Sequence, residues 1–195
     1  MLDKPAGLLC VPGRGADKQD CLSARAQLHF ADALVVHRLD MDTSGLLCMG
    51  RGADAQRRLS MAFAARQVSK RYVAVVTGRL EAPAEEWGII DLPLICDWPN
   101  RPRSKVDHAI GKPSTTRWRV LARTDTTTRL ELEPITGRSH QLRVHLAAIG
   151  HPIVGDPLYG NGHDANGRML LHASAITLPH PRTGEALALL SLPPF

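Results

Sequence analysis

Strand-like segments follow one another along this chain with few helices between them. Residues 70–77 are rich in β-branched side chains, and residues 115–122 and 128–132 alternate between polar and apolar side chains. The last two segments are separated by a short turn, which predicts a hairpin. Residues 170–178 and 186–192 also have the composition of strands. Adjacent strand signals predict an α+β fold with a largely antiparallel sheet, rather than regular βαβ winding.

Only two segments carry clear helical signals. Residues 53–66 place Leu59, Ala62 and Phe63 on one helical face. Residues 139–149 form the second predicted helix, with Ser139 as its N-cap and Gly150 at its end. Residues 81–113 are rich in proline and predict irregular structure, which includes the basic loop at 97–105.

Composition restricts the class of protein. The 195 residues are 44% hydrophobic and 22% charged, with a mean hydropathy of -0.14, as in an ordinary globular domain. No apolar run reaches the ~18 residues of a membrane span, and the N-terminus lacks the apolar core of a signal peptide. A net charge of +5 is compatible with nucleic-acid binding. Aromatic residues make up only 4%, so a broad stacking platform is not expected.

The cysteines and histidines give little support to a metal site. The four cysteines, Cys10, Cys21, Cys48 and Cys96, include no CxxC pair. His140 and His145 are five residues apart, not at the i, i+4 spacing of a zinc helix. We expect reduced cysteines in a cytoplasmic protein, several of them buried, with no metal or cofactor. We also expect His37 to be neutral or hydrogen-bonded rather than a metal ligand.

The densest polar cluster is HRLDMDTSG at 37–45, between the apolar runs 33–36 and Leu46-Leu47. Such a position predicts side chains at the mouth of the fold. The alternative is a strand-to-turn junction in which Asp and Ser cap backbone amides. A DxD phosphatase motif would also use Asp40 and Asp42, but it needs an uninterrupted apolar strand before the first Asp and a Mg²⁺ ion.

A second polar cluster covers residues 136–145. Arg138 and His140 lie at the start of the predicted helix, where exposed backbone N–H groups favour anions. A carboxylate or phosphate bound there would account for these basic residues, and a solvated amphipathic helix is the alternative. The third cluster, GDPLYG at 155–160 with Asn161-Gly162-His163, predicts a surface turn.

Five motifs in order resemble those of the RluA family of pseudouridine synthases. HRLDMDTSG at 37–45 resembles HRLDxxTSG, and residues 135–160 resemble TGRxHQLRxH followed by GDxxYG. The others are Lys4-Pro5-Ala6-Gly7, Lys70-Arg71-Tyr72 and Leu171-His172-Ala173. Residues 91–107 most resemble the founding member of the family, which acts on transfer RNA and on 23S ribosomal RNA.

The resemblance implies a pseudouridine synthase fold: a mixed, mostly antiparallel, split β-sheet with flanking helices around a basic cleft. It covers residues 1–195 as a single catalytic domain. Only three residues precede the Lys-Pro-Ala-Gly motif. We therefore expect a shortened first strand and no RNA-binding S4 domain.

The resemblance also implies the catalytic residues. Asp40 is the essential carboxylate, which could attack C1′, attack C6 or act as a base on C2′. Arg143 pairs with Asp40, which keeps the Asp40 carboxylate ionised and correctly oriented. Tyr72 stacks on the uracil and Leu171 lines an apolar pocket.

Substrate binding follows from the same resemblance. Arg38 fills the gap left by a flipped uridine, and Arg138 and His140 contact the substrate. Fewer than half of the candidate phosphate contacts are expected to touch RNA, and these candidates are Arg66, Lys70, Arg71, Arg101, Arg103, Lys105 and Arg138. The expected partner is structured RNA, transfer RNA and/or 23S rRNA, with no membrane, no obligate protein partner and a monomeric state. The other hypothesis is a non-catalytic RNA-binding module.

Overall fold

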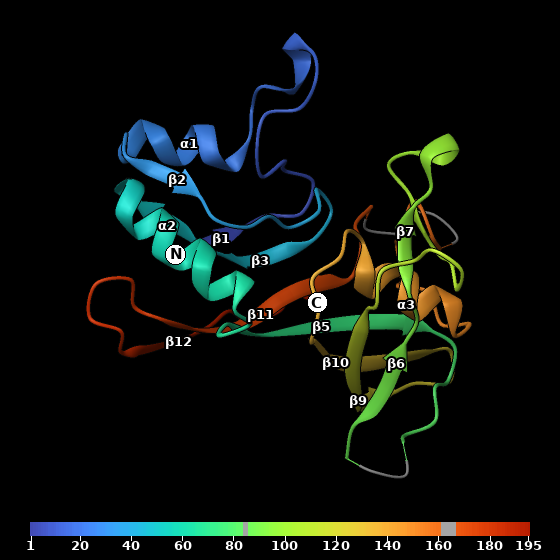
Figure 1. Ribbon diagram of the computed structural model, residues 1–195. Helices are drawn as coiled ribbons and strands as arrows, with labels where there is room; N and C mark the ends of the chain where they lie inside the picture. The colour runs from blue at the N-terminus through green and yellow to red at the C-terminus, as the bar shows by residue number, and fades with distance from the viewer. Residues whose placement is uncertain (84–85, 161–166) are drawn as a thin grey trace. The chain divides into compact units, whose positions relative to one another are not determined.

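The structure, a computed structural model, describes residues 1–83, 86–160 and 167–195. These residues divide into two compact units, each with its own core (Figure 1). Unit 1 contains Met1–Lys70 and His172–Phe195, and unit 2 contains Arg71–Leu171. None of the helices within the described ranges combines the length and hydropathy of a membrane span.

The strands of unit 1 form two groups. In the first, β3 pairs antiparallel with β1 and parallel with β11, and β11 pairs antiparallel with β12. In the second, β2 pairs antiparallel with β4. Their bounds are β1 Leu2–Lys4, β2 Ala33–Val35, β3 Ser44–Leu47, β4 Met49–Arg51, β11 Leu171–Pro179 and β12 Ala186–Leu190. β11 and β12 confirm the strands predicted at 170–178 and 186–192.

Two α-helices belong to unit 1. α2, Gly52–Ala64, confirms the helix predicted at 53–66, and its apolar face packs on the core of this unit. α1, Leu22–His29, was not predicted, because its sequence lacks a clear apolar stripe. The Cys21 thiol begins it by accepting a hydrogen bond from the backbone N–H of Ala24. α1 contacts β2, and α2 contacts β2 and β4.

Gly45 shows why the TSG motif ends in glycine. Its φ of 105° lies in a region that other residues rarely adopt. It is paired with Ala173 between the parallel strands β3 and β11, and a Cβ atom would overlap the Ala173 backbone. A larger residue would therefore push β11 away from the HRLD segment.

The main sheet of unit 2 is antiparallel and runs in the order β5-β10-β9-β6 (Figure 1). The strands are β5 Ser69–Thr77, β6 Gly88–Asp91, β9 Thr115–Arg123 and β10 Thr127–Pro134. β9 and β10 confirm the predicted hairpin, and β5 confirms the strand at 70–77. The side chains on one face form the buried core of this unit with α3.

The prediction of irregular structure over 81–113 was wrong. This segment contains β6 and a second hairpin, made of β7, Leu94–Cys96, and β8, Ser104–Val106. A 3-10 turn, η2, Trp98–Asn100, lies at the hairpin tip. These strands are too short for alternation to reveal them, and β6 is ordered by pairing with the distant strand β9.

α3, Gln141–Ala148, begins two residues later than predicted. Its N-cap residue is His140, in a left-handed conformation with φ 55°, whereas Ser139 is exposed outside the helix. The Gln141 side chain decides this start, because its Oε1 accepts hydrogen bonds from Thr136 Oγ1 and from the Arg138 N–H. The predicted end is confirmed, since Gly150 has a φ of 86°.

Candidate active site

The HRLD segment of unit 1, residues 37–40, is held in place through the backbone of Leu39. Leu39 is buried at 7% exposure, Asp40 is half-buried and Arg38 is exposed. The Cys10 thiol donates to the Leu39 carbonyl at 3.1 Å, and the Leu39 N–H donates to the Cys10 sulfur at 3.2 Å. This arrangement turns Leu39 into the core, while the residues on either side of it are more accessible.

Lys4 also holds this segment in place, and the sequence analysis did not predict this role. Its side chain is buried at 1% exposure, and Nζ donates to the carbonyls of Pro5, Leu8 and Met41 at 2.7–2.9 Å. The Gly7 N–H donates to the same Met41 carbonyl at 2.9 Å. Burial lowers the pKa of Lys4 to about 8, against the attraction of neighbouring acidic groups that include Asp40. The Lys-Pro-Ala-Gly motif therefore fixes the backbone directly after Asp40.

His37 supports the other end of this segment. Its ring stacks on Phe63 with a centroid distance of 4.5 Å, and its Nε2 accepts a hydrogen bond from the Cys48 N–H. Burial, together with repulsion from Lys70, lowers the pKa of His37 to about 4. A ring nitrogen that accepts a backbone hydrogen bond must be unprotonated, so His37 is neutral, as predicted.

A chain of polar contacts, buried at Ser44 and His172, joins the end of the HRLDMDTSG segment to β11 and β12. The Ser44 hydroxyl lies 2.9 Å from His172 Nδ1, and His172 Nε2 lies 3.0 Å from the Ser191 hydroxyl. Ser191 in turn donates to the Asp3 carboxylate at 2.6 Å. Since buried polar groups are costly without partners, this chain specifies how the motif packs on β11.

In unit 2, Arg143 projects from α3 onto Asp156. Arg143 Nε and Nη2 donate to the two oxygens of Asp156 at 2.8 and 2.7 Å. Both side chains are buried, at 2% and 0% exposure. Burial alone would raise the pKa of Asp156. Hydrogen bonds from Arg143 and from the N–H groups of Leu158 and Tyr159 outweigh burial and lower it below its usual value.

The surface turn predicted for 155–160 is therefore wrong: its Asp156 is a fully buried partner of α3. Gly155 permits the sharp turn, since its φ is 79° and a Cβ atom there would overlap the Arg168 carbonyl. The adjacent Asn161-Gly162-His163 lies outside the described residues.

Tyr159 connects this turn to the start of α3 and to the β7–β8 hairpin. Its hydroxyl lies 2.8 Å from His140 Nδ1 and accepts a hydrogen bond from the Ser104 N–H at 2.7 Å. The Arg143 guanidinium lies over its ring at 5.2 Å from the centroid. His140 thus has an internal partner in addition to its predicted contact with substrate, and Tyr159 was not singled out from the sequence.

The remaining polar groups of α3 are also held firmly. Gln141 Nε2 donates to the Thr115 carbonyl and to Thr116 Oγ1, both at 3.0 Å. His145 Nδ1 lies 2.9 Å from Thr116 Oγ1, and its Nε2 lies 3.0 Å from the Leu92 carbonyl. Burial lowers the pKa of His145, so its role in the fold is that of a neutral hydrogen-bonding group.

The other predicted site residues lie on different elements. Tyr72 is half-buried on β5 and packs against the core of unit 2, to which the buried Leu171 also belongs. Arg138 is exposed just before α3. The structure thus brings Arg143, His140 and Arg138 to one end of unit 2. Arg38 and Asp40 belong to unit 1, so the pairing of Asp40 with Arg143 stays a prediction.

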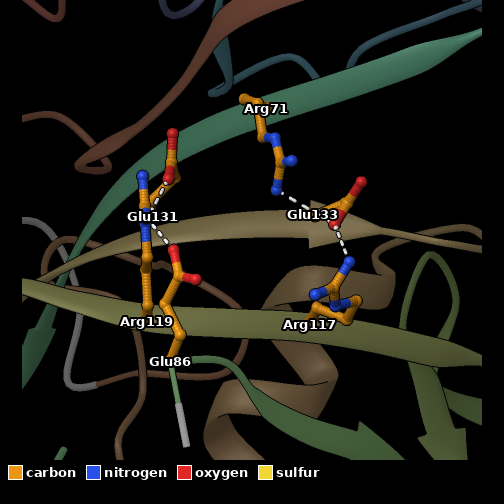
Figure 2. Close-up of polar contacts among 6 residues, drawn as sticks. All are labelled: Arg71, Glu86, Arg117, Arg119, Glu131 and Glu133. Carbon is orange, nitrogen blue, oxygen red and sulfur yellow. Dashed lines mark hydrogen bonds and ion pairs between the residues drawn. The ribbon is translucent and has the colours of Figure 1, made fainter.

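Arg71 is engaged in a charged network on the outer face of the unit 2 sheet (Figure 2). It pairs with Glu133 at 2.9 Å, and Glu133 also accepts from Arg117 at 3.0 Å. Arg71, Arg117 and Arg119 all lie over the Trp87 ring, at 4.6–5.0 Å from its centroid. Because Arg71 is already engaged by Glu133 and Trp87, the prediction that it contacts a phosphate is weakened.

Within the part of the chain that the structure describes, no group of three or more His, Cys, Asp or Glu side chains could hold a metal ion. Cys10, Cys21 and Cys48 are buried thiols, as expected, whereas Cys96 is exposed. The absence of a cofactor stays a prediction.

The family model for RNA pseudouridylate synthases matches residues 1–148. The same family appears among solved structures. Human RNA pseudouridylate synthase domain containing 1 has a TM-score of 0.78 and 29% identity, covering 99% of this chain and 79% of its own. Human RNA pseudouridylate synthase domain containing 4 has a TM-score of 0.75 and 26% identity, over 98% of this chain and 84% of its own.

Sequence relatives define the subfamily. The dual-specificity RNA pseudouridine synthase RluA of Escherichia coli K12 is 47% identical over 190 residues, which are 96% of this chain and 85% of that protein. The protein of the same name from Yersinia pestis is 46% identical, over 96% of this chain and 91% of its own.

Fold and motifs together thus define an isomerase that acts on RNA. The chain belongs to the RNA pseudouridylate synthase family, and within it to the RluA family. The predicted α+β pseudouridine synthase fold is confirmed.

Proposed function

We propose that this enzyme converts a specific uridine to pseudouridine in structured RNA, in the anticodon loop of transfer RNA and in a stem-loop of 23S rRNA. Relatives at 46–47% identity carry the name dual-specificity RNA pseudouridine synthase. The observation that carries the proposal is the clamped HRLD segment. A half-buried carboxylate, Asp40, lies on a backbone that Lys4 and Cys10 hold from both sides.

The reaction breaks the N1–C1′ bond, rotates the detached uracil and rejoins it to the ribose through C5. It is an isomerisation and consumes no external reactant. Asp40 is the proposed reacting carboxylate, and it must be ionised and held in one direction to act. Arg143 is proposed to stabilise that charge, and its ion pair with Asp156 fixes the plane of its guanidinium.

Tyr72 and Leu171 are proposed to hold the base during its rotation. A tyrosine ring can stack on uracil, and an apolar side chain keeps water from the detached base. Arg38 is exposed beside Asp40, which suits a side chain that replaces a flipped uridine. Arg138 and His140 are proposed to bind the RNA backbone next to α3, as part of a basic cleft.

The proposed partner is RNA alone. A single chain acting as a monomer on transfer RNA and ribosomal RNA would work in the cytoplasm, where both substrates occur. Neither an obligate protein partner nor a membrane contact forms part of this proposal.

The test is tritium release from stem-loop RNA labelled at C5 of uridine, in the presence of EDTA. The wild-type protein should release tritium from the target uridine, because C5 loses its hydrogen when it bonds to C1′. Asp40→Asn should release less than about one per cent of the wild-type amount. Its RNA affinity should stay within about tenfold of wild type, ~1.4 kcal/mol.

The outcomes separate the alternatives. RNA binding without tritium release by the wild-type protein would indicate a non-catalytic RNA-binding module. Release of phosphate without tritium, seen only when Mg²⁺ replaces the EDTA, would indicate that Asp40 and Asp42 belong to a phosphatase site. Substantial turnover by Asp40→Asn would exclude Asp40 as the reacting group.

A further inference from the structure

The tip of the β7–β8 hairpin carries a tryptophan that the proposed chemistry does not use. Trp98 begins the 3-10 turn η2, and 65% of its surface is exposed. Figure 1 shows this hairpin extending away from the main sheet of unit 2, with η2 at its end. A single exposed apolar side chain is common on protein surfaces, so the surroundings of Trp98 decide what it can bind.

The tip is held rigidly by its own hydrogen bonds. The Asp97 N–H donates to the Arg103 carbonyl at 2.9 Å, and the Asn100 and Arg103 N–H groups donate to the carbonyls of Asp97 and Asn100 at 3.0 Å each. Asn100 Nδ2 also donates to the Asp97 carboxylate at 2.9 Å. Trp98 is therefore presented in a preformed position, so that a ligand would not have to order this loop on binding.

The charge around Trp98 identifies the class of ligand. Residues 97–105 contain Arg101, Arg103 and Lys105, all exposed, against one acid, Asp97. The Asp97 side chain turns inward: it is 16% exposed, pairs with Lys105 at 3.8 Å and accepts from Asn100. The accessible charge of the tip is thus positive, which favours a polyanion over a neutral or basic surface.

Trp98 and Arg101 together form a platform suited to a nucleobase. The Arg101 guanidinium lies 4.6 Å from the centroid of the Trp98 ring. Both groups are flat, and both stack on unpaired bases in RNA complexes. A polyanion with flat aromatic groups is RNA, whereas an acidic peptide would use the cations and leave the indole without a partner.

The platform is also tied to the start of α3. Ser104, on the hairpin strand β8, donates its N–H to the Tyr159 hydroxyl, and the same hydroxyl lies 2.8 Å from His140 Nδ1. The position of the tip is therefore set relative to Arg143, which lies over the Tyr159 ring.

We infer that Trp98, with Arg101 over its ring, is a stacking site for an unpaired base of the RNA substrate outside the target uridine. The inference rests on the proposed RNA substrate and adds a specificity contact to it. Since the printed ring contact of Trp98 is with Arg101, and neither residue has a proposed role in the reaction, the site should govern binding rather than the chemical step.

The test compares Trp98→Ala, Trp98→Leu and Trp98→Phe for binding to an anticodon stem-loop RNA and for single-turnover tritium release. Loss of stacking should weaken binding about tenfold in Trp98→Ala. Trp98→Phe should stay within about threefold of wild type, while Trp98→Leu should resemble Trp98→Ala. The rate at saturating RNA should be unchanged. Ile110→Ala is the matched control, because Ile110 is an apolar residue of unit 2 that is 71% exposed.

Two further measurements identify the contact. The slope of log K against log salt should be the same for Trp98→Ala and wild type, since stacking releases no counterions, whereas Arg103→Ala should reduce it if Arg103 meets a phosphate. An abasic substitution at the stacked position should weaken wild-type binding but not that of Trp98→Ala.

Equal RNA affinities for wild type and Trp98→Ala would overturn the stacking site. It would also be overturned if Trp98→Phe and Trp98→Leu bound RNA equally well and both bound it more weakly than wild type. A slower rate at saturating RNA with unchanged affinity would also overturn it. These results are independent of the proposed reaction, because tritium release by the wild-type protein tests that reaction separately.

Discussion

Arg143 and Asp156 face each other in a bidentate ion pair from which solvent is excluded. The arginine is therefore oriented by an acid 13 residues later in the chain, and Asp40 is the carboxylate that it is proposed to stabilise. Two hydrogen bonds to one carboxylate restrict the guanidinium plane more tightly than a single charge contact could.

The first prediction concerns this pair. Arg143→Lys should lower the rate of tritium release by a factor of about a hundred or more, because an ammonium group lacks the planar fork. Asp156→Asn should reduce the free energy of unfolding by roughly 3–5 kcal/mol, since it leaves a buried guanidinium without its counter-charge. Thermal or urea unfolding and single-turnover assays measure the two effects.

Arg25→Lys is the matched control, since Arg25 makes a similar bidentate contact with Asp20 but on the exposed surface. It should change stability by less than about 1 kcal/mol. A stable and fully active Asp156→Asn protein would show that the pair is dispensable.

The second prediction concerns Lys4. Lys4→Met keeps an unbranched apolar stem but removes the side-chain donor to the Leu8 carbonyl and one of the two donors to the Met41 carbonyl. It should cost about 2 kcal/mol of unfolding free energy and slow the reaction through the displaced backbone after Asp40. Lys18→Met, at an exposed lysine of the same unit, should have little effect on either quantity.

The pH dependence gives an independent readout. Because burial lowers the pKa of Lys4 to about 8 from 10.5, the folded state binds fewer protons than the unfolded state between these values. The contribution of Lys4 to the free energy of unfolding should therefore increase as pH rises from 8 to 10.5. A difference between wild type and Lys4→Met that does not change over this range would contradict the assignment.

The third prediction concerns His37, whose pKa is lowered from 6.5 to about 4 in the folded state. Protonation of the unfolded state then destabilises the fold as pH falls from about 6.5 towards 4, by up to roughly 3 kcal/mol. His37→Gln keeps a side-chain acceptor but does not titrate, so this variant should lose less unfolding free energy than wild type as pH falls. His29→Gln, at an exposed histidine, should follow the wild-type curve.

The fourth prediction separates base flipping from chemistry at Arg38. Arg38→Ala should slow the reaction much more on a folded stem-loop than on RNA whose target uridine is already unstacked. The reason is that the protein then lacks a side chain to offset a few kcal/mol of unstacking. Single-turnover rates on both RNAs make the comparison. The same deficit on both would indicate a role of Arg38 in the chemistry or the fold.

Local patterns in the sequence predicted the regular elements well. Alternation located β9 and β10, and a helical stripe located α2, because in each case the side-chain period reports which face is buried. The ordered motifs predicted the family and its α+β fold. The short strands β6, β7 and β8 were missed, since their order comes from pairing with other strands rather than from their own composition.

The sequence by itself determined the family and the fold class, and it predicts the HRLD carboxylate and the arginine of α3 as the reacting groups. Only the tertiary structure decided which groups hold them. Lys4 reaches Met41 across 37 residues, and Ser44 meets His172 across 128. A buried charge or hydroxyl must find a partner, but the partner is set by through-space distance after folding, which no local spacing encodes.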